Sequence, residues 1–222
     1  MILLVTGYEL KSYREHPAQI LAVAPCCPGC GRLLHRHGSY WRWVYLGGNE
    51  AYRLPIFRFR CRRCRLTVSL LPDFLIPYFR YAAAVISAAL VAYALTAASL
   101  RQIAATLHEG IAHGGDDLQE GLPNLATIQS WFRRFRAWVS TYLTALVRWV
   151  LRLLPTSPAL WLLAEPPGEV PPATPARRQG AALIRVACGL ALGGQAWLSW
   201  LNRFVLGVLG QLPWHRPPPN LR

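Results

Sequence analysis

The chain has 222 residues, of which 53% are hydrophobic and 15% are charged. This composition excludes a disordered charged tail. The charge is lopsided, with 24 Lys and Arg against 10 Asp and Glu, and the net charge of +14 indicates a polyanionic partner, either a nucleic acid or an anionic membrane face. Acids are also too few for a carboxylate-rich active site over most of the chain.

The N-terminal segment, residues 1–25, has a mixed composition and begins with only five apolar residues. It lacks the basic start, long apolar core and small-residue cleavage site of a secretory signal. We therefore expect a short buried strand at its start and a cytoplasmic protein. In a reducing cytosol, paired CxxC motifs are more often metal ligands than disulfides.

Residues 26–80 are rich in Cys, Arg and aromatic residues and predict a small β zinc ribbon. Aromatic and β-branched residues predict strands over 40–45 and 52–61, joined by a turn at 47–50. Pro55 makes the second strand an edge or a bulged strand. A CxxC pair flanks each side of this hairpin, and two such pairs supply four thiolates in a tetrahedron, as in structural Zn²⁺ sites. The predicted ligands are Cys27, Cys30, Cys61 and Cys64.

Alternatives to this site are two unmetallated thiol pairs or a redox dithiol, although the βαβ context of a redox motif is absent. Cys26 is an alternative ligand to its neighbour Cys27. We expect His35 and His37, on one strand face, to face phosphate or pack on the hairpin, because four sulfurs already fill the coordination sphere. Cys188, in an apolar run, is predicted to be a buried thiol.

Five arginines crowd the end of the second strand and its knuckle. Strand periodicity places Arg58 and Arg60 on one face and Phe57 and Phe59 on the other, which predicts a cationic and an apolar face. Four thiolates around one Zn²⁺ carry a charge of −2, and five arginines exceed what neutralises it. We therefore predict phosphate contacts, with a solvated face as the alternative, by Arg58, Arg60, Arg62, Arg63 and Arg65.

Residues 81–154 are rich in Ala and Leu and predict a helical domain. The stretch 81–100 has no charged residue and is long enough to span a bilayer, but nine of its 20 residues are Ala, so we expect a buried bundle helix. Ser99 and Gln102 form a capping box for a short helix over 100–107. Asn124 caps a long helix over 125–154, with an apolar stripe that includes Ile128, Trp131, Phe132, Phe135, Val139, Tyr142, Leu143 and Leu146.

This pair of helices predicts a helix-turn-helix, although its connection, 108–123, is longer than usual and contains four acids. Small and amide side chains approach base edges, and arginines reach guanine or phosphate. The alternative is an ordinary bundle helix with a solvated face. The predicted DNA contacts on the second helix are Thr127, Gln129, Ser130, Arg133, Arg134 and Arg136.

The remainder is predicted as a Pro-rich linker over 155–180 and a C-terminal helix and tail over 181–222. The apolar 181–212 segment has a stripe that we expect to pack on the 138–154 helix, with a homo-oligomer contact as the alternative: Trp197, Trp200, Phe204 and Val208.

The runs at 27–31, 35–40, 58–67 and 70–78, with 99–104 and 126–135, resemble an uncharacterised bacterial family. Its members look like the zinc-ribbon and helix-turn-helix N-terminal region of insertion-sequence transposases. The resemblance implies zinc at the four cysteines and DNA contact by the 125–136 helix. It does not imply transposition, because such transposases add a domain with three separated carboxylates for two metal ions, and after residue 120 only Glu165 and Glu169 are acidic.

Together these observations predict an α+β protein: a small β zinc ribbon, a helix-turn-helix bundle and a C-terminal apolar helix. The predicted function is that of a zinc-dependent, non-enzymatic protein that binds double-stranded DNA. One alternative is a membrane-associated protein with spans at 81–100 and 186–209, which Asn202 and Arg203 disfavour. The other is a zinc-ribbon module that binds protein or RNA.

Overall fold

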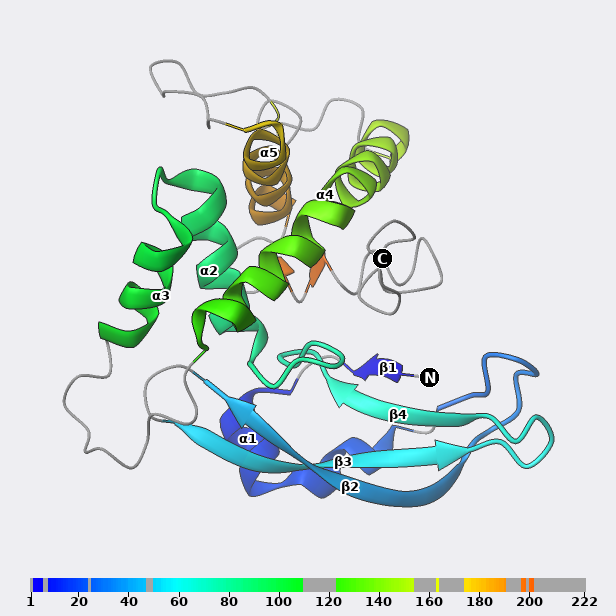
Figure 1. Ribbon diagram of the computed structural model, residues 1–222. Coiled ribbons are helices and arrows are strands. Elements are labelled where there is room, and N and C mark those ends of the chain that lie inside the picture. The colour runs from blue at the N-terminus through cyan, green and yellow to red at the C-terminus, as the bar shows by residue number, and fades with distance from the viewer. Residues whose placement is uncertain are drawn as a thin grey trace. The chain divides into compact units, whose positions relative to one another are not determined.

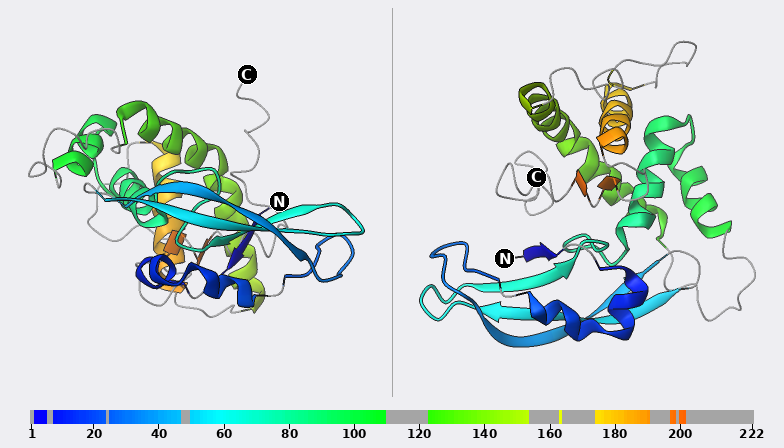
Figure 2. Two further views of the ribbon diagram at one scale, coloured as in Figure 1. Left: turned by 90° about the horizontal axis from the view of Figure 1, so that it is seen from below. Right: turned by 180° about the vertical axis from the view of Figure 1, so that it is seen from behind.

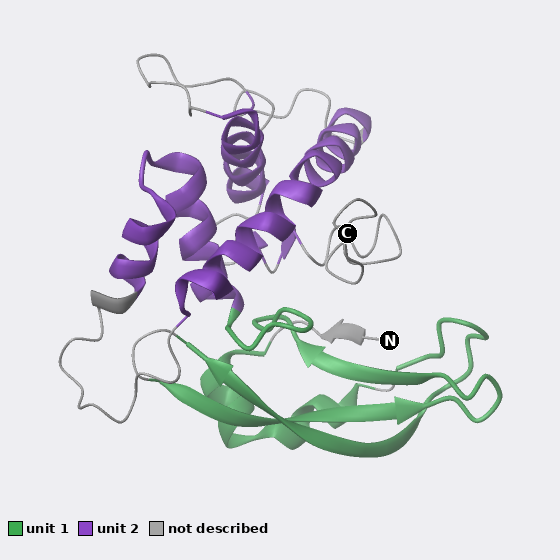
Figure 3. Ribbon diagram, viewed as in Figure 1, with its two compact units in different colours: residues 1–46, 50–82 green, residues 47–49, 83–222 purple. Residues whose placement is uncertain are grey.

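The computed structural model describes residues 2–5, 8–23, 25–46, 50–109, 123–153, 163, 174–190, 197, 198, 200 and 201. The chain divides into two compact units (Figure 3). The first unit comprises residues 1–46 and 50–82, and the second comprises residues 47–49 and 83–222. The five regions predicted from composition divide the chain more finely than these two units do. That finer division stays a prediction.

The first unit is built on a four-stranded sheet in the order β1-β4-β3-β2 (Figure 1). The predicted hairpin is present as β2 (His35–Tyr45) and β3 (Ala51–Arg60), and β4 (Thr67–Pro72) is antiparallel to β3. The N-terminal strand β1 (Ile2–Val5) pairs with β4 in parallel. No strand is predicted from sequence over 67–72, because six residues of mixed polarity, Thr-Val-Ser-Leu-Leu-Pro, do not by themselves distinguish strand from helix.

Pro55 lies in a part of β3 that has a strand on one side only. Among the described residues, β4 pairs with Arg58–Arg60, whereas β2 runs along the whole of β3. A proline lacks the N–H that a central strand must donate, so this edge position tolerates it. The bulge lies in β2 instead, where the register shifts between Arg36 and Ser39 and Gly38 has a φ of 90°.

Helix α1 (Leu10–Glu15) and the 3-10 helix η1 (Pro17–Ala22) lie against the sheet (Figures 1 and 2). Tyr13 of α1 is fully buried, its ring meets Phe74 edge-on, and its hydroxyl donates a hydrogen bond of 2.5 Å to the Pro55 carbonyl. Burial raises the pKa of Tyr13, which stays a neutral donor. The core around it includes Ile20, Val44, Leu54, Ile56, Leu70 and Leu71.

Arg42 of β2 holds the turn that follows β4. Its guanidinium donates hydrogen bonds to the carbonyl oxygens of Ile76, at 2.7 Å, and of Phe79. Burial lowers the pKa of Arg42. The backbone N–H of Ala82 then donates to the Tyr45 carbonyl at 2.9 Å. The guanidinium of Arg42 therefore has a structural role in the first unit.

The helices that are described in full in the second unit are α2 (Ala83–Leu95), α3 (Leu100–Glu109), α4 (Leu125–Leu153) and α5 (Pro175–Leu190). α5 packs on α2 and α4, and α3 packs on α2 and α4 (Figure 1). The helix predicted over 81–100 is shorter than expected. It ends at Leu95, and Arg177 of α5 donates to the carbonyls of Thr96 and Ala98 just beyond that end, at 3.2 and 2.8 Å.

Both predicted caps are confirmed. The Ser99 N–H donates to Oε1 of Gln102 at 2.7 Å, and the Gln102 N–H donates to Oγ of Ser99 at 3.2 Å, which is a complete capping box. Oδ1 of Asn124 accepts a bond of 2.8 Å from the Thr127 N–H. The predicted apolar stripe of α4 is buried, apart from Leu143, which is half-buried.

The prediction of an extended linker is wrong for residues 175–180, which form the start of α5. Proline at the first helical position costs no hydrogen bond, and Thr174 caps the helix by accepting from the Arg177 N–H at 3.3 Å. Of the predicted C-terminal stripe, Trp197 is buried and Trp200 is half-buried. Phe204 and Val208 lie outside the described residues, as do most of the linker, most of the 108–123 connection and most of the 186–209 segment.

No helix in the described part of the chain is long and apolar enough to cross a membrane. In the first of the two candidate spans, 81–100, the continuous helix is α2, which has 13 residues. The chain then leaves this helix, and α3 begins at residue 100.

Gly180 allows three helices of the second unit to approach closely. A Cβ atom there would lie 2.9 Å from Cε1 of Phe135 in α4 and 3.4 Å from Cβ of Ala94 in α2. Alanine favours a helix by about 1 kcal/mol over glycine, but overpacking a filled core costs about 1–3 kcal/mol. We therefore expect Gly180→Ala to lower the free energy of unfolding by about 1 kcal/mol.

The control is Gly189→Ala, at an exposed position of the same helix. It should raise stability slightly, because only the propensity term applies. Urea unfolding followed by circular dichroism measures both variants. Equal stabilisation by the two substitutions would contradict the close packing at Gly180.

Candidate metal centre and its cationic surroundings

Two pairs of cysteines that are far apart in the sequence meet at one end of the sheet. The sulfurs of Cys27, Cys30, Cys61 and Cys64 all lie within 4.8 Å of one another, and those of Cys30 and Cys61 are 3.6 Å apart. A tetrahedral site with metal–sulfur bonds of about 2.3 Å separates its sulfurs by about 3.8 Å. A disulfide would need about 2.05 Å, and all four are free thiols. The cluster therefore fits a tetrahedral metal ion and is compatible with zinc.

Two knuckles of the same backbone shape present these cysteines. The Cys27 N–H donates to the Arg32 carbonyl at 2.7 Å, and the Cys61 N–H donates to the Leu66 carbonyl at 2.9 Å, five residues on in both cases. Each knuckle ends on a residue in the left-handed region, Gly31 with φ 70° and Arg65 with φ 56°. The sequences Cys-Pro-Gly-Cys-Gly and Cys-Arg-Arg-Cys-Arg thus adopt one conformation.

The sheet brings the knuckles together. The first precedes β2, the second joins β3 to β4, and the pairing of His35 with Arg60 sets the adjoining strand ends side by side. Cys26, the alternative ligand, is exposed, forms a β-bridge with Leu33 and lies outside the cluster. It therefore does not replace Cys27.

Hydrogen bonds within the cluster favour a thiolate at Cys61. The backbone N–H of Cys64 donates to Sγ of Cys61 at 3.3 Å and lowers the pKa of Cys61 to about 7. The hydrogen bond to the Cys30 sulfur raises the pKa of Cys64, because the cluster resists a second negative charge. A divalent cation held by the four sulfurs would relieve this repulsion and take the place of the remaining protons.

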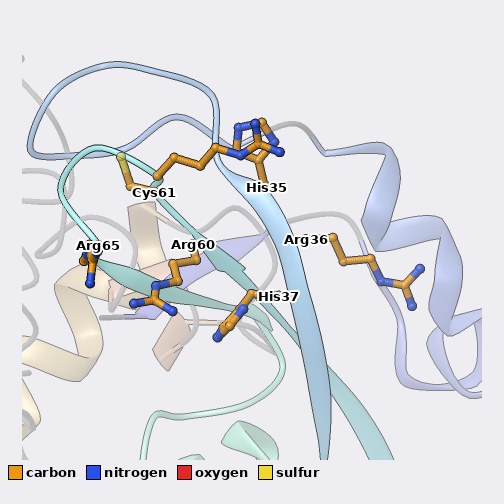
Figure 4. Close-up of a pocket in the computed structure, with 7 residues that line it drawn as sticks. His35, Arg36, His37, Arg60, Cys61 and Arg65 are labelled. Atoms are coloured by element: carbon orange, nitrogen blue, oxygen red, sulfur yellow. The ribbon is translucent and has the colours of Figure 1, made fainter.

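The predicted arginines of the first unit divide into two groups. Three of them line a cavity of about 470 Å³ beside the metal cluster, whereas Arg58 and Arg63 do not (Figure 4). Arg58 is half-buried and in register with Ser69 of β4, and Arg63 is exposed. The described residues that line the cavity are His35, Arg36, His37, Arg60, Cys61, Arg62 and Arg65.

The predicted separation of an apolar from a cationic face is present at the end of β3, where Phe57 and Phe59 are buried and Arg58 and Arg60 are half-buried. It does not extend back along the strand, because Leu54 and Ile56 share the face of the two arginines and are almost completely buried. Only the end of this face next to the second knuckle is cationic. The packing of α1 and η1 on the sheet is not predicted from sequence, and it accounts for the apolar end of the face.

The predicted contacts on α4 differ in accessibility. Gln129, Arg133 and Arg136 are exposed, whereas Thr127, Ser130 and Arg134 are half-buried, and Arg134 is engaged by other residues. The two predicted groups of DNA-contacting residues lie in different units. Two further exposed arginines on the C-terminal half of the helix are not among the predicted contacts; they are Arg148 and Arg152.

Residues 27–108 match a family that is described as a domain of unknown function, DUF6431. The match includes both CxxC pairs and extends into α3, but it ends before α4. No curated protein and no solved structure matches the chain significantly. The chain is therefore similar over this stretch to a family that carries no functional description.

The geometry predicts that one metal ion binds per chain and that Cys61 is indispensable. Cys61→Ser should abolish stoichiometric metal after dialysis, because a hydroxyl is a poor substitute for a thiolate ligand. Cys26→Ser, one residue outside the cluster, should keep it. Metal analysis of the purified proteins by mass spectrometry tests this. Equal metal content in the two variants would contradict the assignment.

Proposed function

We propose that the protein is a zinc-dependent, double-stranded DNA-binding protein, related to transposases in ancestry but without strand-transfer activity. The observation that carries this proposal is the composition of α4. Its 29 residues contain five arginines and no carboxylate, and its outer face exposes Arg133 and Arg136. A cationic helix with an open face is suited to a phosphate-lined groove.

The exposed residues of the first half of α4 share one side of the helix. Ala126, Gln129, Arg133 and Arg136 follow one another at steps of three and four residues, so they lie along one face. A small residue lets the helix approach base edges, an amide pairs with adenine, and arginine pairs with guanine or phosphate. This half of α4 is the proposed recognition helix, and α3, which packs on it, is the proposed first helix of the motif.

The metal has a structural role in this proposal. The donor set of four thiolates is that of structural zinc sites, which leave no open position for a substrate. After residue 120, the only acids are Glu165 and Glu169, too few for a two-metal nuclease centre. We therefore propose a binding role rather than a catalytic one for this stretch of chain, and we place it in the cytoplasm because its cysteines suit a reducing compartment.

A second candidate is a module that binds single-stranded RNA or DNA. The edge strand β2 exposes Trp41 and Trp43, at 58% and 53%, and the guanidinium of Arg53 lies over the Trp41 ring at 5.4 Å. Exposed aromatic rings with neighbouring cations stack on unpaired bases. Trp41→Ala and Trp43→Ala would weaken single-strand binding and leave duplex binding unchanged if this candidate holds.

Selection of bound duplexes from a random pool by the zinc-loaded protein tests the main proposal. Arg133→Ala with Arg136→Ala should remove the sequence preference and weaken binding by about 1–3 kcal/mol for each arginine that pairs with a base. The matched control, Arg148→Ala with Arg152→Ala, removes the same charge from the other half of α4. It should weaken all duplexes alike and preserve the preference. An unchanged preference in the first double variant would exclude the recognition helix.

A further inference from the structure

The cavity beside the metal cluster collects donors from three segments of the chain. His35 and His37 come from β2, Arg60 from the end of β3, and Arg62 and Arg65 from the second knuckle. Figure 4 shows the side chains of His37, Arg60 and Arg65 on one side of β2, whereas Arg36 points the other way. The Arg36 guanidinium lies 5.6 Å from the Phe57 ring, which accounts for its direction.

The backbone at Arg65 indicates that its side chain has a role. Arg65 has a φ of 56°, and at the equivalent position of the first knuckle the chain has Gly31, which adopts this conformation without strain. A non-glycine residue in the left-handed region costs about 1–3 kcal/mol. The fold alone therefore favours glycine at position 65, and the arginine is kept there at a cost to stability.

Charge in the cavity is unbalanced. None of the described lining residues is acidic. His35 directly faces Arg60 across the strands, so a histidine and an arginine lie side by side in a cavity whose described lining contains no carboxylate. A metal ion with four thiolates has a charge of −2, which two arginines offset. The knuckles and the end of β3 contain six arginines, so four are left over once two have offset this charge. The six are Arg32, Arg58, Arg60, Arg62, Arg63 and Arg65.

We propose that this cavity is a binding site for one phosphate group, held by Arg60, Arg62 and Arg65 with the imidazoles of His35 and His37. The inference rests on the proposed function, in which the bound group is a phosphate of the DNA backbone. A free phosphate ion is the other source of the same chemistry. Guanidinium groups bind phosphate oxygens in pairs of parallel hydrogen bonds. The cavity volume of about 470 Å³ leaves room for the sugar attached to the phosphate.

Two variants with the same net charge isolate the site. Arg65→Gly removes a lining cation and relieves the left-handed backbone, so the variant folds at least as well as the parent. Arg63→Ala removes an exposed cation of the same knuckle that does not line the cavity. The full, zinc-loaded chain is titrated with inorganic phosphate at constant ionic strength, and the imidazole NMR signals of His35 and His37 are followed.

We expect saturable shifts of both imidazole signals in the parent and in Arg63→Ala. In Arg65→Gly, phosphate binding should weaken about tenfold, as for the loss of a charge-assisted hydrogen bond. Chloride at the same ionic strength should produce no shift. Absence of shifts in the parent, or equal weakening in both variants, would overturn the proposal, because the effect would then be one of net charge.

A duplex titration at several salt concentrations distinguishes the two sources of phosphate. If the phosphate belongs to DNA, Arg65→Gly lowers the slope of log K against log salt by about 1 relative to Arg63→Ala. Phosphate binding without duplex binding would support the cavity as a free-phosphate site and overturn the proposed function. Duplex binding that is equally strong in both variants, with no imidazole shift from phosphate, would overturn the cavity proposal and leave the proposed function standing.

Discussion

The four-sulfur cluster is the contact on which the first unit depends. It joins a knuckle before β2 to a knuckle after β3, and so it closes the end of a hairpin that the polar side chains of β2 leave largely exposed. Structural zinc supplies about 10–16 kcal/mol in small metal-binding domains, and a whole domain has a net stability of about 5–15 kcal/mol. A contribution of that size would equal the net stability of a whole domain, so loss of the ion is expected to unfold the first unit even though Tyr13 and its neighbours still pack on the sheet.

Arginine serves two different purposes in this chain. Arg42 and Arg177 donate to backbone carbonyls next to a turn and a helix end, and each adds stability to its own unit. No such hydrogen bond is described for the arginines of the second knuckle, Arg62 and Arg65. None is described for the arginines of the outer face of α4, Arg133 and Arg136. Composition alone does not separate these classes, since all of them contribute equally to the net charge of +14. It is the second class that supports a polyanionic partner.

The four-cysteine cluster, the hairpin and the helix caps are predictable from sequence because each depends on residues at fixed local spacing. The CxxC pairs, the box of Ser99 with Gln102 and the cap at Asn124 are of this kind. What sequence reasoning misses depends on tertiary packing: β4 in the sheet, the burial of Leu54 and Ile56 under α1 and η1, and the start of α5 inside a Pro-rich stretch. The cavity is missed in part because its lining combines β2 with the second knuckle, and only the register of His35 with Arg60 brings them together.

Amide hydrogen exchange of the full chain, with zinc bound and after zinc is removed by a chelator, tests the central claim most directly. If the cluster organises the first unit, removal of the metal abolishes protection over β2, β3 and β4, while the amides of α2, α4 and α5 exchange at unchanged rates. Unchanged protection of β2 and β3 in metal-free protein would contradict the account, because the sheet would then be stable without the metal ion that we place at its end.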